Sequence, residues 1–157
     1  DALHALSEAT DYKKLKNFLR EYAPLLLSKQ QAQQEVPFRV FETEGFKILV
    51  GKSARNNDEL TQRHTYKEDL WLHAKDVSGS HVVIKHQAGK TIPTTVLEKA
   101  AQLAAYYSKR KSDSLCPVLY TPKKWVRKPK GSAPGSVVVE REKVILVKPE
   151  NPFERQH

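Results

Sequence analysis

Two histidines beside a predicted turn are the first candidates for chemistry. His73 and His81 flank the turn Val77-Ser-Gly-Ser80. Neutral imidazole binds metals and titrates near neutrality, so the pair is a candidate for metal binding or for nuclease-like acid–base catalysis. A metal site needs further ligands at matched spacing, and no third ligand sits at a recognisable spacing. The other interpretation is that these histidines donate hydrogen bonds to a phosphate, to a ribose or to the backbone of a sheet.

The strongest single feature is the segment 122–130, PKKWVRKPK. Five cations surround Trp125, and the two prolines keep the segment from forming a helix. An aromatic ring among cations is typical of surfaces that bind single-stranded or looped RNA. The alternative is a solvated charged loop with Trp125 tucked into the core.

The charge of the chain favours the RNA interpretation. The 157 residues include 27 Lys and Arg against 18 Asp and Glu, a net charge of +9. Residues 1–35 are balanced, whereas residues 109–130 hold eight Lys and Arg against Asp113 alone. A localised excess is what a phosphate-binding surface requires, because each neutralised phosphate releases counterions. We therefore expect a nucleic-acid partner.

Two weaker signals lie elsewhere in the chain. Ser78-Gly79-Ser80 either presents backbone N–H groups to an anion or is a hairpin turn that needs glycine for a positive φ. Arg55, Asn56 and Asn57 follow Gly51-Lys-Ser53. This segment is not a phosphate-binding loop but a helix start that either faces an anion or is merely capped. The predicted RNA-binding residues are Lys109, Arg110, Lys111, Lys123, Lys124, Trp125, Arg127, Lys128, Lys130, His73, Ser80, His81, Arg55 and Asn56.

The composition excludes several classes of protein. One cysteine, Cys116, excludes an internal disulfide framework and a multi-cysteine zinc site. No apolar run approaches the roughly 20 residues that cross a bilayer. We predict no catalytic residues, metal or cofactor. The chain contains no Met and begins at Asp1, so we expect a processed chain or a part of a longer protein.

The first 34 residues are predicted to form a helix. Thr10 or Asp11 caps it, and Pro24 kinks or ends it. Its apolar residues recur at spacings of three and four, the pattern of a coiled-coil seam: Tyr12, Leu15, Leu19, Tyr22 and Leu26. Residues 28–35 are polar and read as a fraying tail or a linker. Whether this segment pairs with a second chain is not determined by two heptads.

Residues 36–150 are predicted to form one α+β domain with a mainly antiparallel sheet and two helices, followed by a disordered tail over 151–157. A capping box of Thr95 and Glu98 starts the second helix, and the basic residues 109–111 end it. Three hairpins are expected, the last joining 137–139 to 144–147. The expected strands are 38–41, 46–50, 69–75, 81–85, 117–121, 137–139 and 144–147, and the helices 53–61 and 95–111.

Three sequence blocks resemble the NFACT-R domain of the NFACT family. They are Gly51-Lys-Ser-Ala-Arg-Asn-Asn-Asp-Glu-Leu60, Asp69-Leu-Trp-Leu-His-Ala74 and Gly79-Ser-His-Val-Val-Ile84. The helix around Ala100 to Tyr107 and the basic Lys-Lys-Trp stretch follow in the same order as in the family. The resemblance covers about residues 38–148, and residues 1–34 would then be the end of the family's middle coiled coil.

The resemblance implies a role in ribosome-associated quality control in the cytoplasm. Members of the family bind the large ribosomal subunit with an obstructed nascent chain and recruit tRNA, and in bacteria they extend that chain with alanine. The implied partners are tRNA, ribosomal RNA and the remaining domains of the same protein. The NFACT-R module is regarded as RNA-binding and non-catalytic. An adhesin-like module remains a further alternative, because an older name of the family refers to fibronectin binding.

Overall fold

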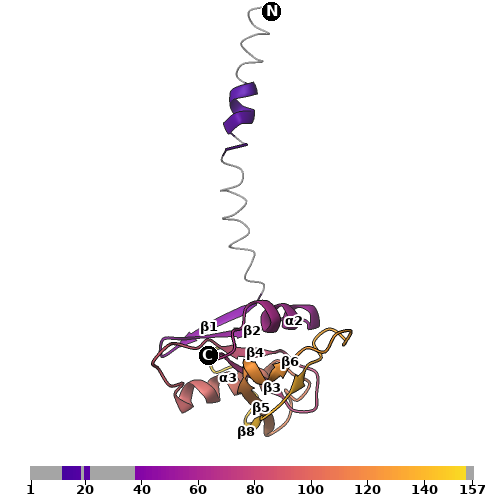
Figure 1. Ribbon diagram of the computed structural model, residues 1–157. Helices are drawn as coiled ribbons and strands as arrows, with labels where there is room; N and C mark the ends of the chain where they lie inside the picture. The colour runs from indigo at the N-terminus through magenta and orange to yellow at the C-terminus, as the bar shows by residue number, and fades with distance from the viewer. Residues whose placement is uncertain (1–11, 19, 22–37, 155–157) are drawn as a thin grey trace, which may run out of the picture. The chain divides into compact units, whose positions relative to one another are not determined.

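The computed structural model describes residues 12–18, 20, 21 and 38–154 (Figure 1). The described residues before position 22 are helical, as predicted. Leu19, Tyr22, Leu26 and the expected linker 28–35 lie outside the described residues. Contacts divide the chain into residues 1–36 and residues 37–157. The second unit carries the sheet, and the fold is α+β as predicted.

The second unit alternates short strands with two α-helices and one 3-10 helix. Its elements are β1 (Arg39–Thr43), β2 (Phe46–Val50), α2 (Ala54–Arg63), β3 (Leu70–Ala74), β4 (Val82–Ile84), α3 (Thr94–Tyr106), β5 (Cys116–Pro122), η1 (Lys123–Trp125), β6 (Val126–Arg127), β7 (Val138–Val139) and β8 (Lys143–Val147). None of the helices within the described ranges has the length and apolar character that crossing a membrane requires.

Six of these strands form one antiparallel sheet in the order β1-β2-β4-β3-β5-β8. The central strands are apolar on both faces, and all three residues of β4 are fully buried. Leu72, Val82 and Ile84 face α3, whose Ala-rich surface permits close contact. Trp71 and Val83 face the opposite side, where Leu60 of α2 and Val126 cover them. The sheet is therefore covered on both faces at its centre (Figure 1).

The first hairpin follows its prediction. Glu44 and Gly45 form a two-residue turn in which both φ angles are positive, 51° and 81°. Such a turn matches the twist of the flanking strands, and glycine at its second position adopts the angle without strain. This pairing sets the register of Thr43 opposite Phe46, which places Phe46 and Ile48 in the core beneath α3.

Asp69 joins the start of β3 to the end of β4. Its buried carboxylate accepts hydrogen bonds from the backbone N–H groups of Tyr66 and His86, at 2.8 and 2.7 Å, and pairs with the Lys85 ammonium. A buried carboxylate is stable only when such partners surround it. The first residue of the Asp-Leu-Trp-Leu-His block therefore holds two strands together.

The predicted last hairpin is wrong. β7 pairs with β6 in a separate two-stranded sheet, and β8 pairs with β5. Arg141, with φ of 53°, turns the chain between them. Pairing with β5 places Val147 opposite Cys116 and Ile145 opposite Val118, against the α3 side of the sheet. A local hairpin would leave these apolar side chains without that cover.

Both predicted ends of the helix α3 are also wrong. The helix is capped by Pro93 without a side-chain hydrogen bond, and the Thr95 hydroxyl donates to the Glu44 carboxylate instead of closing a capping box. It ends at Tyr106, so the basic residues 109–111 lie in the turns beyond it.

The predicted disordered tail is wrong for residues 151–154. They include Phe153, whose ring centroid lies 4.9 Å from that of Phe41 in β1.

Gly79 is required for a reason other than the predicted one. The φ angle of Gly79 is not positive, so the turn does not need glycine for its backbone conformation. A Cβ at this position would lie 2.7 Å from the Cβ of Ser108 and 3.2 Å from the carbonyl oxygen of Tyr107. The β3–β4 turn and the end of α3 therefore approach so closely that only glycine fits.

We predict that Gly79→Ala lowers the free energy of unfolding by about 1–3 kcal/mol, because the added methyl group displaces backbone at Ser108. Urea unfolding followed by circular dichroism measures this difference. Ser78→Ala is the matched control, since Ser78 is the exposed neighbour in the same turn. Equal stability of the two variants would contradict the close approach.

Candidate nucleic-acid interface

The β3–β4 hairpin brings the two candidate histidines together. Leu72 lies opposite Val82 in the register, which places His73 beside His81, as the sequence predicts. Their ring centroids are 5.4 Å apart at 90°. The ring of Trp71 lies 5.8 Å from His73 and almost parallel to it, at 9°, and meets His81 edge-on at 5.2 Å. Three rings thus form one cluster on the side of the sheet that faces α2.

Both ring nitrogens of His81 are used by the fold. Nδ1 lies 2.7 Å from the Thr61 hydroxyl, and Nε2 lies 3.0 Å from the carbonyl oxygen of Gly135. A carbonyl oxygen only accepts, so Nε2 carries the proton and Nδ1 accepts from Thr61. His81 therefore joins α2 and the loop that contains Gly135, and neither nitrogen is directed at solvent.

Asn57 completes this buried polar group; it follows Asn56 in the predicted helix start but is not one of the predicted RNA-binding residues. Its amide nitrogen donates to the carbonyl oxygen of Gly79 at 3.1 Å, and its amide oxygen accepts from the His81 backbone at 3.0 Å. The signal that reveals it is its position on α2, on the same buried face as Leu60 and Thr61. A polar side chain on an apolar helix face needs partners inside the protein.

Burial keeps both histidines neutral. Desolvation lowers the pKa of His81 to about 4, and repulsion from His73 contributes to the same shift. Desolvation also lowers the pKa of His73, although hydrogen bonds with the Gly79 and Ala74 backbone act in the other direction. At neutral pH the ring cluster is therefore uncharged.

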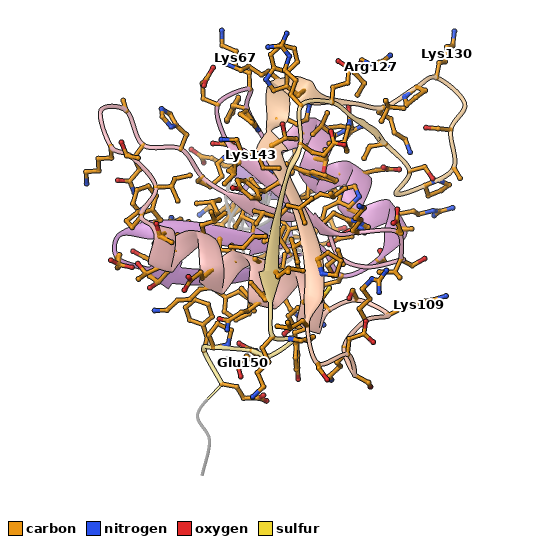
Figure 2. The ribbon with its side chains drawn as sticks, turned by 90° about the horizontal axis from the view of Figure 1, so that it is seen from below. Lys67, Lys109, Arg127, Lys130, Lys143 and Glu150 are labelled. Atoms are coloured by element: carbon orange, nitrogen blue, oxygen red, sulfur yellow. The ribbon has the colours of Figure 1, made fainter. Side chains whose placement is uncertain are left out.

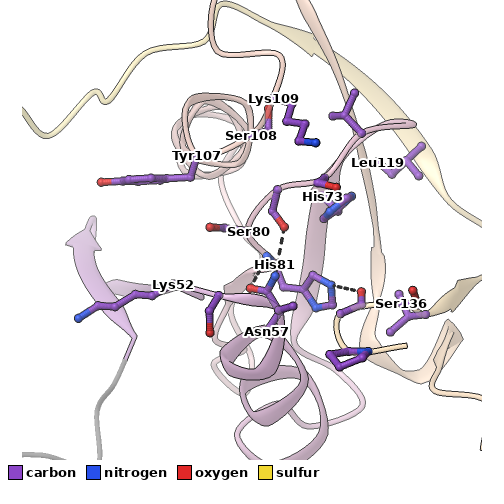
Figure 3. Close-up of a pocket in the computed structure, with 18 of the residues that line it drawn as sticks. Lys52, Asn57, His73, Ser80, His81, Tyr107, Ser108, Lys109, Leu119 and Ser136 are labelled. Atoms are coloured by element: carbon purple, nitrogen blue, oxygen red, sulfur yellow. Dashed lines mark hydrogen bonds between the residues drawn. The ribbon is translucent and has the colours of Figure 1, made fainter. Parts of the chain in front are cut away.

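A groove of about 690 Å³ opens beside this cluster (Figure 3). Its charged lining residues are Lys52 and Lys109, which lie on different walls, and no Asp or Glu is among the residues that line it. The exposed Ser78 and Ser136 border it as well. The volume suits a small ligand or part of a larger one, and the charge favours an anion.

Three further predicted site residues are Ser80, which lines the groove, and Asn56 and Arg55, which do not. The Ser80 hydroxyl donates to the carbonyl oxygen of Gly51 at 2.5 Å and is buried. Asn56 takes part in the cap of α2: its backbone N–H donates to the hydroxyl of the N-cap residue Ser53, and its side-chain oxygen accepts from the backbone of Lys52. Arg55 is exposed on the same helical turn.

The basic stretch 109–130 is divided by β5 into two groups. Lys109, Arg110 and Lys111 precede this strand, and the cations from Lys123 to Lys130 follow it. Seven residues of β-strand span roughly 20 Å. Figure 2 shows Lys109 well apart from Arg127 and Lys130. The two groups therefore lie at opposite ends of β5, and a single RNA has to extend along this strand to contact both of them.

The first group, residues 109–111, contributes Lys109 to the lining of the groove. Arg110 donates to the carbonyl oxygen of Lys75 at 3.0 Å and pairs with Asp113 at 3.2 Å. The Lys111 ammonium lies over the Tyr106 ring, 4.1 Å from its centroid. Lys109 is exposed and lines the groove.

The second group, residues 123–130, includes one cation that stabilises the fold. Lys128 pairs with Asp58 at 3.1 Å and donates to the carbonyl oxygens of Ala133 and Ser136 at 2.5 and 3.0 Å. It thereby ties the loop 131–136 to α2. Burial lowers the pKa of Lys123.

The exposed members of this second group are Lys124, Arg127 and Lys130. Lys124 and Arg127 form surface pairs with Glu68 at 3.4 Å and Glu140 at 3.6 Å. Exposed pairs of this kind contribute little stability, so these cations are able to exchange a carboxylate for a phosphate. Trp125 is half-buried, and the Arg141 guanidinium covers its ring at 4.1 Å.

We predict that acid destabilises the fold through His81. The unfolded chain takes up a proton near pH 6.5, whereas folded His81 does so only near pH 4, so stability falls as the pH decreases between these values. The loss is roughly 3 kcal/mol for a shift of this size. Urea unfolding from pH 7 to pH 4 should show a flatter profile for His81→Gln than for the native chain. His86→Gln, at an exposed histidine, is the control and should keep the native slope.

The described parts of the chain hold no group of three His, Cys, Asp or Glu side chains that converge as metal ligands do. The candidate binding features of this domain are thus the ring cluster, the groove and the two basic groups.

The family model described as "NFACT protein RNA binding domain" matches residues 36–141. The chain is 42% identical over 122 residues to the Rqc2 homolog RqcH of Bacillus subtilis, covering 78% of this chain and 21% of that protein. It is 29% identical over 100 residues to the ribosome quality control complex subunit NEMF of Mus musculus, covering 61% of this chain and 9% of that protein. The chain thus spans about a fifth of RqcH.

A solved structure has the same fold. It is the C-terminal part of the fibronectin/fibrinogen-binding protein from Streptococcus suis, with a TM-score of 0.67 and 41% sequence identity, and it covers 72% of this chain and 46% of that chain. Because the family match extends over well more than half of the 157 residues, this chain belongs to the NFACT-R family of RNA-binding domains and is homologous to bacterial RqcH and eukaryotic NEMF.

Proposed function

We propose that this domain binds tRNA or ribosomal RNA through its two basic groups and the groove beside the first of them. The observation that carries this proposal is the distribution of charge. Residues 38–154 contain 21 Lys and Arg against 13 Asp and Glu, and the groove has two lysines and no carboxylate among its lining residues. Phosphate neutralisation by such cations supplies most of the affinity of a protein for RNA without regard to sequence.

We further propose that the domain belongs to a protein that acts in ribosome-associated quality control in the cytoplasm. The support is its homology to RqcH and NEMF, the second of which is called a ribosome quality control complex subunit. In this proposal the parent protein binds obstructed large subunits and recruits tRNA for C-terminal alanine tailing. The other domains of that protein supply the remaining contacts, since this chain spans about a fifth of RqcH.

The first test measures how RNA affinity depends on salt. We expect the triple change of Lys124, Arg127 and Lys130 to Ala to weaken tRNA binding and to reduce the salt slope by about one for each lost phosphate contact. Fluorescence anisotropy with labelled tRNA at several salt concentrations measures both quantities. Lys128 is left unchanged, because its loss would free the loop 131–136 and confuse binding with folding.

The matched control removes the same charge elsewhere. Lys47, Lys90 and Lys148 are exposed and lie outside both basic groups. Their triple change to Ala should leave the salt slope close to that of the native chain. If both triple variants reduce the slope equally, the binding reflects net charge alone and the proposed surface is wrong.

The domain is proposed to bind RNA without cleaving it. A nuclease-like role for the histidine pair needs a ring nitrogen that exchanges protons with the substrate. His81 has both nitrogens in hydrogen bonds to Thr61 and Gly135, and its pKa of about 4 keeps the ring neutral. We expect end-labelled tRNA incubated with the domain, with and without divalent metal, to stay intact on a denaturing gel. Cleavage that His73→Ala abolishes would establish the nuclease.

Binding of fibronectin is the second candidate function. The observation in its favour is the 41% identity to the C-terminal part of a streptococcal protein that is named for this property. A strongly basic surface also attracts acidic proteins, and such attraction disappears at moderate salt. The salt series with fibronectin in place of tRNA separates a specific contact from general attraction.

A further inference from the structure

We propose that the groove beside His73 holds one unpaired nucleotide of the bound RNA, with its base stacked on the His73 ring. This inference rests on the proposed RNA-binding function and assigns a binding mode to part of that surface. It is carried by the ring stack along β3, by the second opening next to His73 and by the lysines around it.

The ring stack supplies the platform. Trp71 and His73 are two residues apart on β3 and therefore project from the same face of the strand. Their rings lie 9° from parallel with centroids 5.8 Å apart, within the range of offset-stacked pairs. Trp71 is 1% exposed, whereas His73 is partly exposed and lines both openings. The stack is thus closed at Trp71 and open at His73, where a further flat ring would continue it.

The space beyond His73 is open. A second opening of about 540 Å³ is lined by His73, Asp76, Val77, Ser78 and Lys109. His73 and Lys109 border both this opening and the larger groove. Figure 3 shows the Lys109 side chain near the His73 ring. A base on His73 would therefore lie in the second opening, with its sugar and phosphate towards the larger groove.

The charges around the two openings differ, and they assign the phosphates to the larger groove and the base to the second opening. Lys109 and Lys52 provide positive charge along the larger groove, where the phosphates would lie. Asp76 is the acidic residue of the second opening, and its carboxylate accepts hydrogen bonds from base amino groups while it disfavours phosphate at that end. The hydroxyl of Ser78, exposed between them, is available to ribose or phosphate oxygens.

The platform is neutral and held in place. Burial lowers the pKa of His73, so that at neutral pH its ring acts as an uncharged stacking surface. His81 meets the His73 ring edge-on at 5.4 Å and is itself fixed by Thr61 and Gly135. A preorganised ring loses little entropy when a base binds to it. Paired bases do not reach such a ring, so the site selects single strands, loops and ends.

The test uses a short single-stranded oligoribonucleotide with one 2-aminopurine, whose fluorescence is quenched when its base stacks. Binding to the 157-residue chain should quench the probe. His73→Phe keeps a flat ring and should retain quenching and affinity, whereas His73→Ala should lose the quenching and weaken binding by about 5- to 150-fold, the range expected for one stacked base. His86→Ala, at an exposed histidine that does not line the groove, should match the native chain.

A second variant, at Lys109, tests the site without changing His73 or the ring stack. Lys109 is exposed, so Lys109→Ala leaves the fold intact and should weaken binding of the same probe while reducing the salt slope by about one. The ring-stacking proposal is overturned if His73→Ala binds and quenches like the native chain, or if His73→Phe loses as much as His73→Ala.

The failures of the two proposals are distinguishable. If the probe binds with a normal salt slope and is not quenched, the domain binds RNA through its basic groups and the nucleotide site on His73 is wrong. If neither tRNA nor the probe binds at low salt, the proposed RNA-binding function fails as well. A duplex of the same sequence that binds as tightly as the single strand and responds equally to His73→Ala would also contradict the site.

Discussion

The side-chain amide of Asn57 is the contact on which the arrangement of this domain depends. It donates to the Gly79 carbonyl in the β3–β4 turn and accepts from the His81 backbone at the start of β4. A buried amide without these partners would cost about 1–3 kcal/mol, so the helix α2 has one favourable position against the hairpin. Gly51 makes that position accessible, because a Cβ there would lie 2.0 Å from the Asn57 amide oxygen. Gly79 lets the same turn approach Ser108 at the end of α3.

Several polar groups of the characteristic sequence blocks therefore stabilise the fold rather than bind a ligand. Asp69 joins β3 to β4, the Ser80 hydroxyl bonds to the Gly51 carbonyl, and His81 ties α2 to the loop 131–136. Lys128 attaches the same loop to Asp58 of α2. These contacts leave His73 as the ring of the cluster that is partly exposed to the groove. Most polar side chains of these blocks are bonded within the fold. The candidate surface is therefore defined by the few that remain accessible, such as Lys52, Lys109 and Ser78.

Much of the fold follows from local patterns. The first hairpin, the start of α2 near Ser53, the α+β class and the placement of His73 and His81 beside one turn were all predicted, because each depends on residues close together in sequence. The errors involve distant partners. β8 pairs with β5 because this pairing buries its apolar side chains beneath α3. The Thr95 hydroxyl bonds to Glu44 rather than to its own helix. No local pattern reports which distant strand edge or side chain is nearby.

The sequence by itself determined the class of the domain, its family blocks and the large excess of positive charge between residues 109 and 130. Only the tertiary structure decided how that charge is used, because β5 extends through the middle of the stretch and separates its two groups. It also decided that Lys128 is a structural residue and that the two histidines differ. One is closed in by Thr61 and Gly135, and the other borders a groove. Charge and residue type are properties of the chain, whereas burial and accessibility arise only when distant segments pack.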